Sequence, residues 1–105
     1  MSLGFRFLIL SGKYGLLEAN DPIPYYDHLL LSSEVSEHAI RVADQLEALG
    51  VKQLIFFTRS LADDENVKPY IDCIKFASLK VGVNLKIIEL PKSNDYGQEN
   101  FKKAF

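Results

Sequence analysis

Three stretches of the chain are apolar with few interruptions, and two longer stretches between them place apolar residues at helical spacing. The apolar stretches are residues 5–10, broken only by Arg6, residues 53–58 and residues 84–90. Continuous apolarity, in contrast to strict alternation, is typical of parallel strands that are covered on both faces. We therefore predict three buried strands, and we expect residues 11–26 to form a long ordered connection.

The first helical stretch lies between the first and second predicted strands. Ser32 or Ser33 is the expected N-cap, and Glu34 and Glu37 fall in the first turn, where acidic groups complement the helix dipole. Gly50 is the expected left-handed terminator. The predicted buried stripe consists of Val35, Ala39, Val42, Leu46 and Leu49.

The second helical stretch has Pro69 in its first turn and Gly82 at its end. Its predicted apolar face consists of Tyr70, Ile74, Ala77 and Val81. Cys73 lies beside this face, so we interpret it as a packing residue. The acidic residues 63–65 are expected to cap the helix, and a short terminal helix is expected to bury Phe101 and Phe105.

Strands that alternate with helices at this spacing predict a single α/β domain over residues 1–105. We expect a three-layer α/β/α fold of the Rossmann or flavodoxin type, with a parallel sheet of three strands, two long crossover helices and a short C-terminal helix. Right-handed crossovers place both long helices on one face if the strand order is 1-2-3, and on opposite faces if it is 2-1-3. Order 2-1-3 suits strands that are apolar on both sides, so it is the order that we predict.

Composition narrows the function classes only slightly. The formal charge of −2 argues against a strongly basic nucleic-acid binder, although it leaves room for a local basic pocket. Cys73 is the only cysteine, so no internal disulfide is possible and the cytoplasm is the expected compartment. No apolar run approaches membrane-spanning length, so no membrane partner is expected.

The candidate site follows from the predicted sheet, because open parallel sheets bind ligands at the carboxyl ends of their strands. Three loops leave those ends: residues 11–15, 58–60 and 92–97. In the first loop, Gly12 and Gly15 allow backbone N–H groups to approach an anion closely. Lys13 and Arg59 supply positive charge, and Asp27 is a candidate to clamp a sugar hydroxyl or to act as a base.

Each of these residues also has a purely structural interpretation. Lys13 beside glycines is equally consistent with a solvated turn residue. Tyr14 and Tyr26 are more consistent with a roof over the core than with ligand contact. Asp27 is equally consistent with an Asx turn. Glu34 and His38 are one helical turn apart, but no third ligand is within sequence reach, so neither a metal site nor another cofactor is expected.

The motif around the first loop also resembles a known signature. Residues 9–17, followed by Ile23, Tyr26 and Asp27, are similar to a pattern found in small bacterial proteins of unknown function, Leu-Ser-Ala-Lys-Tyr-Gly-Leu-Leu and then Pro-Tyr-Asp. A looser form resembles part of the YaaA peroxide-stress family, which is associated with DNA binding. The match covers about a fifth of the chain, with Gly12 in place of the usual alanine and Tyr25 in place of the proline.

The resemblance implies that a native strand and helix precede this chain, and it singles out a small set of site residues but no reaction. The expected catalytic residues are Asp27 and Lys13, and the expected ligand-binding residues are Ser11, Gly12, Tyr14, Gly15, Tyr26 and Arg59.

Three functions are open at this point, and whether the protein is an enzyme is open with them. The first is binding or processing of a nucleotide, a nucleobase or another phosphorylated small molecule at the carboxyl edge of the sheet. The second is a non-catalytic module that contacts DNA, which the acidic net charge argues against. The third is a structural domain that assembles, for example as a homodimer, through its apolar sheet.

Overall fold

The computed structural model describes residues 6–18 and 28–90, and its first element is a hairpin. Strand β1 (Leu8–Ser11) pairs antiparallel with strand β2 (Gly15–Glu18), and Leu10 lies opposite Leu16. The loop between them has three residues, 12–14, and is followed by Gly15, whose φ is +78°. A left-handed residue in this position is typical of three-residue hairpin loops, and glycine adopts it without steric cost.

Two helices follow, each introduced by a short 3-10 turn. The turn η1 (Ser32–Glu34) leads into α1 (Val35–Leu49), and η2 (Glu65–Val67) leads into α2 (Lys68–Val81). Gly50 and Gly82 end the helices with φ of 70° and 72°, so the predicted glycine terminators are confirmed. Pro69 lies in the first turn of α2, also as predicted.

The helix caps agree with the sequence only in part. Neither Ser32 nor Ser33 caps α1 by its side chain. Instead, the carboxylate of Glu34 accepts the backbone N–H of Leu31 at 2.9 Å, which satisfies a donor that the helix start leaves open. Before α2, the Asp64 carboxylate accepts the N–H of Asn66 at 3.0 Å, so one member of the acidic run caps as predicted.

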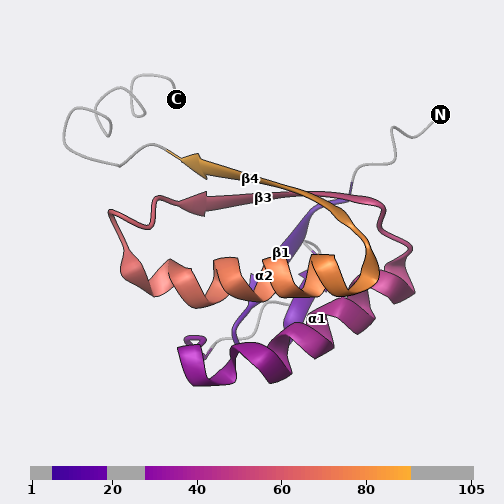
Figure 1. Ribbon diagram of the computed structural model, residues 1–105, viewed down its shortest axis with the longest axis horizontal. Helices are drawn as coiled ribbons and strands as arrows, with labels where there is room; N and C mark the ends of the chain where they lie inside the picture. Colours follow the sequence, from indigo (N-terminus) through magenta and orange to yellow (C-terminus); the bar gives the residue numbers. More distant parts are fainter. Residues whose placement is uncertain (1–5, 19–27, 91–105) are drawn as a thin grey trace.

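Strands β3 (Gln53–Arg59) and β4 (Asn84–Leu90) pair in parallel, and α2 is the crossover between them. Figure 1 shows three levels, with the β3–β4 sheet above α2 and α2 above α1. The helices pack closely on each other, and their fully buried residues form the centre of the core. These include Val42, Ala43, Leu46, Cys73, Ile74 and Ala77, so the packing role predicted for Cys73 is confirmed.

The predicted fold class is wrong. The described residues form two separate two-stranded sheets, one antiparallel and one parallel, in an α+β arrangement rather than a three-layer sandwich around one sheet of three strands. The predicted strand order 2-1-3 is therefore also wrong. The second and third predicted strands correspond to β3 and β4, and these pair directly with each other. The physical reason lies in Gly15, which reverses the chain immediately after β1 and gives that strand a local partner in residues that were expected to be a loop.

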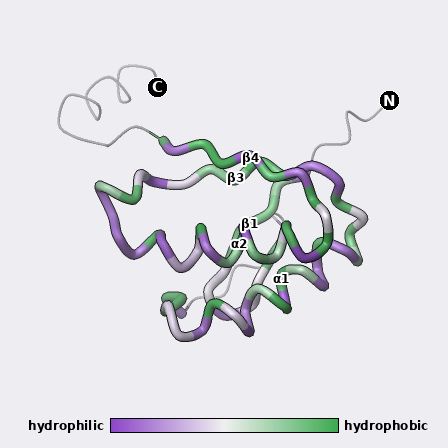
Figure 2. Tube along the Cα trace, viewed as in Figure 1, coloured by the Kyte–Doolittle hydropathy of each residue, from purple (hydrophilic) through white to green (hydrophobic). Residues whose placement is uncertain are grey.

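Within residues 6–18 and 28–90, no second layer covers the β3–β4 sheet, although its continuous apolarity predicts one. Leu54, Phe56 and Leu85 pack against the helical core. Ile55 and Phe57 point the other way, because successive side chains of a strand alternate between faces, and they are 52% and 58% exposed. In Figure 2 both strands of this sheet carry hydrophobic stretches.

Some predictions fall on residues 1–5, 19–27 and 91–105, which lie outside the described residues. These include the loop at residues 92–97 and the short terminal helix with Phe101 and Phe105. Within the described part of the chain, neither helix combines the length and apolarity needed to cross a membrane.

Candidate functional site

The loop between β1 and β2 is built around the Ser11 side chain. Ser11 is buried, and its Oγ accepts the backbone N–H groups of Lys13 at 3.1 Å and of Tyr14 at 3.0 Å. These two bonds satisfy polar groups that the turn would otherwise leave without strand partners. The structure thus gives Ser11, which the sequence suggested as a ligand contact, a role in shaping the loop.

Two side chains of α1 hold this loop from the helix side. His38 is buried, and its Nε2 donates to the carbonyl oxygen of Ser11 at 2.7 Å. A carbonyl oxygen can only accept, so Nε2 of His38 carries a proton. Arg41 donates from Nη1 to the carbonyl oxygen of Lys13 at 2.8 Å. The backbone of Lys13 is therefore fixed beside a second cationic residue.

Gln45 continues the same attachment one turn further along α1. Its Oε1 accepts the N–H of Leu16 at 2.7 Å, and its Nε2 donates to the carbonyl oxygens of Leu16 at 3.1 Å and Tyr14 at 3.4 Å. An amide side chain offers both a donor and an acceptor, so it can bind both backbone groups of one strand residue. Gln45 thus fixes β2 to the helix.

Gly12 occupies a position that has no room for a larger residue. It is buried, and a Cβ there would overlap the carbonyl oxygen of His28 and lie 2.9 Å from both the Leu30 nitrogen and the Tyr70 hydroxyl oxygen. The Tyr70 hydroxyl accepts the N–H of Leu30 at 3.0 Å. The glycine therefore lets the hairpin loop lie directly against the segment that enters α1.

A histidine–glutamate pair closes one side of the loop. The Nε2 of His28 lies 2.8 Å and 2.9 Å from the two carboxylate oxygens of Glu34. The hydrogen bond from the Leu31 N–H, followed by the one from His28, holds the pKa of Glu34 below its ordinary value, because both stabilise the ionised carboxylate. Glu34 is therefore a carboxylate that is already engaged in the fold.

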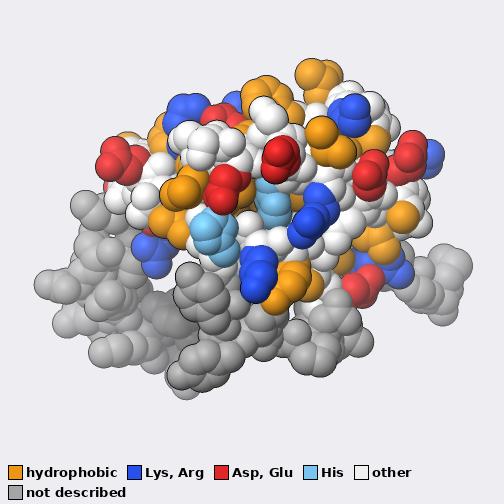
Figure 3. All heavy atoms as spheres, turned by 90° about the horizontal axis from the view of Figure 1, so that it is seen from below, with side chains coloured by type: hydrophobic (Ala, Val, Ile, Leu, Met, Phe, Trp, Pro, Cys, Tyr) orange, Lys and Arg blue, Asp and Glu red, His pale blue; other side chains and the backbone are white. Residues whose placement is uncertain are grey.

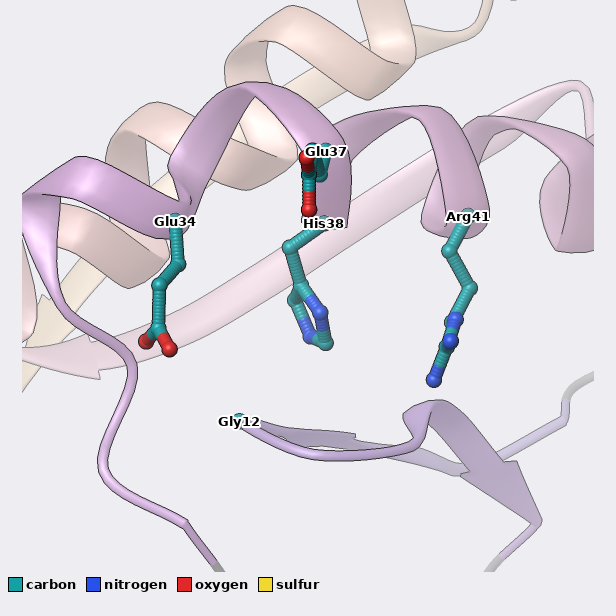
Figure 4. A pocket seen from close by; sticks show the side chains of 5 residues that line it. All are labelled: Gly12, Glu34, Glu37, His38 and Arg41. Carbon is teal, nitrogen blue, oxygen red and sulfur yellow. The ribbon is translucent and has the colours of Figure 1, made fainter.

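These contacts leave a polar pocket between α1 and the hairpin. Its volume is about 150 Å³, and its lining residues are Gly12, Glu34, Glu37, His38 and Arg41. In Figure 4 the side chains of Glu34, His38 and Arg41 extend from α1 toward the hairpin loop at Gly12. Figure 3 shows the same side of the molecule, where both histidines and several acidic and basic side chains gather. The pocket therefore offers hydrogen-bond donors and acceptors, and charges of both signs.

Comparison with known proteins assigns no family to the chain. No protein-family model, curated protein or solved structure matches the chain. The resemblance to the Leu-Ser-Ala-Lys-Tyr-Gly-Leu-Leu signature and to the YaaA family therefore stays a prediction, and the function has to be argued from the geometry of the pocket.

The structure brings together some of the predicted site residues and separates others. Gly12 lines the pocket, and Lys13 and Tyr14 follow it on the same loop, with the Lys13 Nζ 5.3 Å from the centroid of the Tyr14 ring. Gly15 is buried against Gln45 at the foot of the loop. Tyr26 and Asp27 lie outside the described residues.

Arg59 does not belong to this pocket. It ends β3 in the other sheet, its side chain is 76% exposed, and its Nη1 lies 4.0 Å from the Asp64 carboxylate. The expectation that it would join the Lys13 loop depended on both strands ending at one edge of a common sheet. Because β1 and β3 lie in different sheets, that edge does not exist.

Sequence reasoning missed the residues that α1 contributes. Glu37, His38, Arg41 and Gln45 form a polar stripe at spacings of one, three and four residues, next to the predicted apolar stripe. This pattern was the available signal, since residues three and four apart share a helix face.

The alternative of a shared metal on Glu34 and His38 finds no support in their contacts. Glu34 binds His28, and His38 binds the Ser11 carbonyl. Among the described residues, no three His, Cys, Asp or Glu side chains come together as metal ligands.

Proposed function

We propose that this chain binds a nucleotide, a nucleobase or another phosphorylated small molecule, with the phosphate or a sugar of the ligand in the pocket at Gly12. The observation that carries the proposal is the hydrogen bond from Arg41 to the backbone carbonyl oxygen of Lys13. This bond holds the loop that bears Lys13 against Arg41, which lines the pocket. Cationic side chains bind phosphates through strong, charge-assisted hydrogen bonds.

The size of the pocket sets how much of the ligand enters it. A cavity of about 150 Å³ accommodates a molecule of the size of benzene. One phosphate or one sugar ring therefore fits, whereas a complete nucleotide does not, and the remainder of the ligand lies over the exposed Lys13 and Tyr14. An aromatic ring at that place is suited to contact a base.

A thermal-shift panel tests this function. Nucleosides, nucleotides, phosphosugars and short DNA are each added to the natural chain, to Lys13→Ala and to the control Lys75→Ala, which removes an exposed lysine of α2. A ligand at about 100 times its Kd stabilises the folded state by about 2.7 kcal/mol. We expect a shift with a phosphorylated ligand that Lys13→Ala reduces and Lys75→Ala leaves intact.

Two results would overturn the proposal. The first is the absence of a shift with any phosphorylated small molecule, and the second is an equal shift in Lys13→Ala and the natural chain. A shift with DNA alone that disappears steeply as salt rises would instead support the DNA-contacting alternative.

A second function, self-association, is favoured by the outer face of the β3–β4 sheet. The register places Phe57 beside Ile88 and Arg59 beside Leu90, and Ile55, Phe57 and Leu90 are each about half exposed. Parallel strands are normally covered on both faces, and the same face of a second copy would provide the missing apolar cover.

Sedimentation over a range of concentrations tests self-association. We expect a dimer that Phe57→Ser weakens and that the control Leu79→Ser, on the exposed side of α2, leaves unchanged. A monomer at every concentration would exclude this second function.

A further inference from the structure

One acidic side chain lies both in the first turn of α1, where it complements the helix dipole, and at the pocket. Glu37 lines the pocket and is exposed, and no hydrogen bond or ion pair joins its carboxylate to another described residue. The other lining carboxylate, Glu34, already accepts from the Leu31 N–H and from His28. Glu37 is therefore the carboxylate that is available to a ligand.

The position of Glu37 relative to Arg41 adds a second constraint. The two residues are four apart on α1, which places their Cβ atoms roughly 5–6 Å apart on one helix face. Opposite charges at this spacing commonly pair, yet no ion pair joins Glu37 to Arg41. The pocket thus presents a carboxylate and a guanidinium from successive turns of one helix face.

An ionised carboxylate only accepts hydrogen bonds, and its two oxygens suit a pair of neighbouring hydroxyl groups. A guanidinium only donates, and it suits a phosphate. A ribose 5′-phosphate carries both partners on one small unit, with two adjacent hydroxyls on the ring and the phosphate at its end. A nucleobase lacks the hydroxyl pair, and a 2′-deoxyribose retains only one of its members.

We propose that Glu37 binds the 2′- and 3′-hydroxyls of a ribose while Arg41 and Lys13 bind its 5′-phosphate, so that the pocket selects ribonucleotides over deoxyribonucleotides. This inference rests on the proposed function and names its ligand class. The base lies outside the pocket, because a volume of about 150 Å³ accommodates no more than one sugar ring or one phosphate. Discrimination among bases is therefore weak.

Calorimetric titration tests the inference with four probes, the 5′-monophosphates of adenosine, uridine and their 2′-deoxy forms. The proteins are the natural chain, Glu37→Gln and the control Glu47→Gln, which changes an exposed glutamate further along α1. Loss of one hydrogen bond to a charged group corresponds to about a tenfold weaker Kd or more. We therefore expect the natural chain and Glu47→Gln to bind each ribonucleotide about tenfold or more tightly than its 2′-deoxy form. In Glu37→Gln, the two forms should differ in Kd by about twofold or less.

The possible failures are distinguishable. If ribo and deoxy forms bind the natural chain equally, the ribose assignment is wrong while phosphate binding stands. If Glu37→Gln keeps the full preference, another group reads the hydroxyls and the assignment to Glu37 is wrong. If none of the four probes binds, this inference fails, and the thermal-shift panel decides separately whether the chain binds another phosphorylated ligand. Ribose 5-phosphate alone provides a further check, since it should bind within a few-fold of the nucleotides.

Discussion

Replacement of Gln45 by alanine is the sharpest test of how the hairpin is attached. The side chain makes two hydrogen bonds with the backbone of Leu16, at 2.7 Å and 3.1 Å, and a longer one with the carbonyl oxygen of Tyr14 at 3.4 Å. A typical intramolecular hydrogen bond contributes about 1 kcal/mol to stability. If each of the two short bonds contributes about 1 kcal/mol and the long bond contributes little, Gln45→Ala should lower the free energy of unfolding by about 2 kcal/mol.

The measurement is urea unfolding monitored by circular dichroism, with Glu47→Ala as the matched control. Glu47 is exposed on the same helix, so its replacement reports the effect of helix propensity without the contacts to β2. In a domain of about this size, 2 kcal/mol corresponds to a decrease in Tm of roughly 8 °C or more. If Gln45→Ala and Glu47→Ala are equally stable, the hairpin does not lie on α1 and the pocket at Gly12 is not formed as described.

Three further predictions concern Gly12, Glu34 and Cys73. Gly12→Ala should destabilise the fold by about 1–3 kcal/mol in urea unfolding, because the methyl group overlaps the His28 carbonyl oxygen; unchanged stability would show that the loop lies elsewhere. The pKa of Glu34 is lowered, so its contribution to stability is present above pH 4.5 and is lost as the pH falls through the pKa of the folded state. Glu34→Gln should therefore reduce the loss of folding stability below pH 4.5, and an unchanged loss would contradict this. Burial raises the pKa of the Cys73 thiol to about 11, so a thiol reagent at pH 8 should label it only after unfolding, whereas rapid labelling of the native chain would contradict its burial.

The helices and the last two strands were predictable because their signals are local. The apolar stripe of α1, the glycine at each helix end and Pro69 at the start of α2 all act through short-range sterics and hydrogen bonding. The bounds of β4 were predicted to the residue, and those of β3 to within one residue.

The pairing of the strands was less predictable, because an apolar run does not indicate which other strand it pairs with. Residues 8–10 satisfy the pattern of a central parallel strand equally well as that of a hairpin arm. The deciding feature is the positive φ of Gly15, which allows β2 to return at once along β1. Gly15, which the sequence predicts as a ligand-binding residue, thus also supplies the turn of the hairpin.

The candidate site was likewise predictable only where its signal is local. The loop of Gly12 and Lys13 was identified from its composition, and the structure places it at the pocket. The helix side of the pocket was missed, since His38 and Arg41 fall on a polar stripe that in isolation resembles a solvated face. Only the position of the hairpin makes that stripe part of a site, and the position depends on pairing that the sequence pattern leaves open.

Chemical-shift mapping tests the central claim most directly. The ¹⁵N-labelled chain is titrated with adenosine 5′-monophosphate, and the backbone amide signals are followed. We predict changes at residues 12–14 and 34–41, the two segments that meet at the pocket, with the signals of β3 and β4 unaffected. Changes centred on Arg59 and the end of β4, with the Lys13 loop unaffected, would contradict the account.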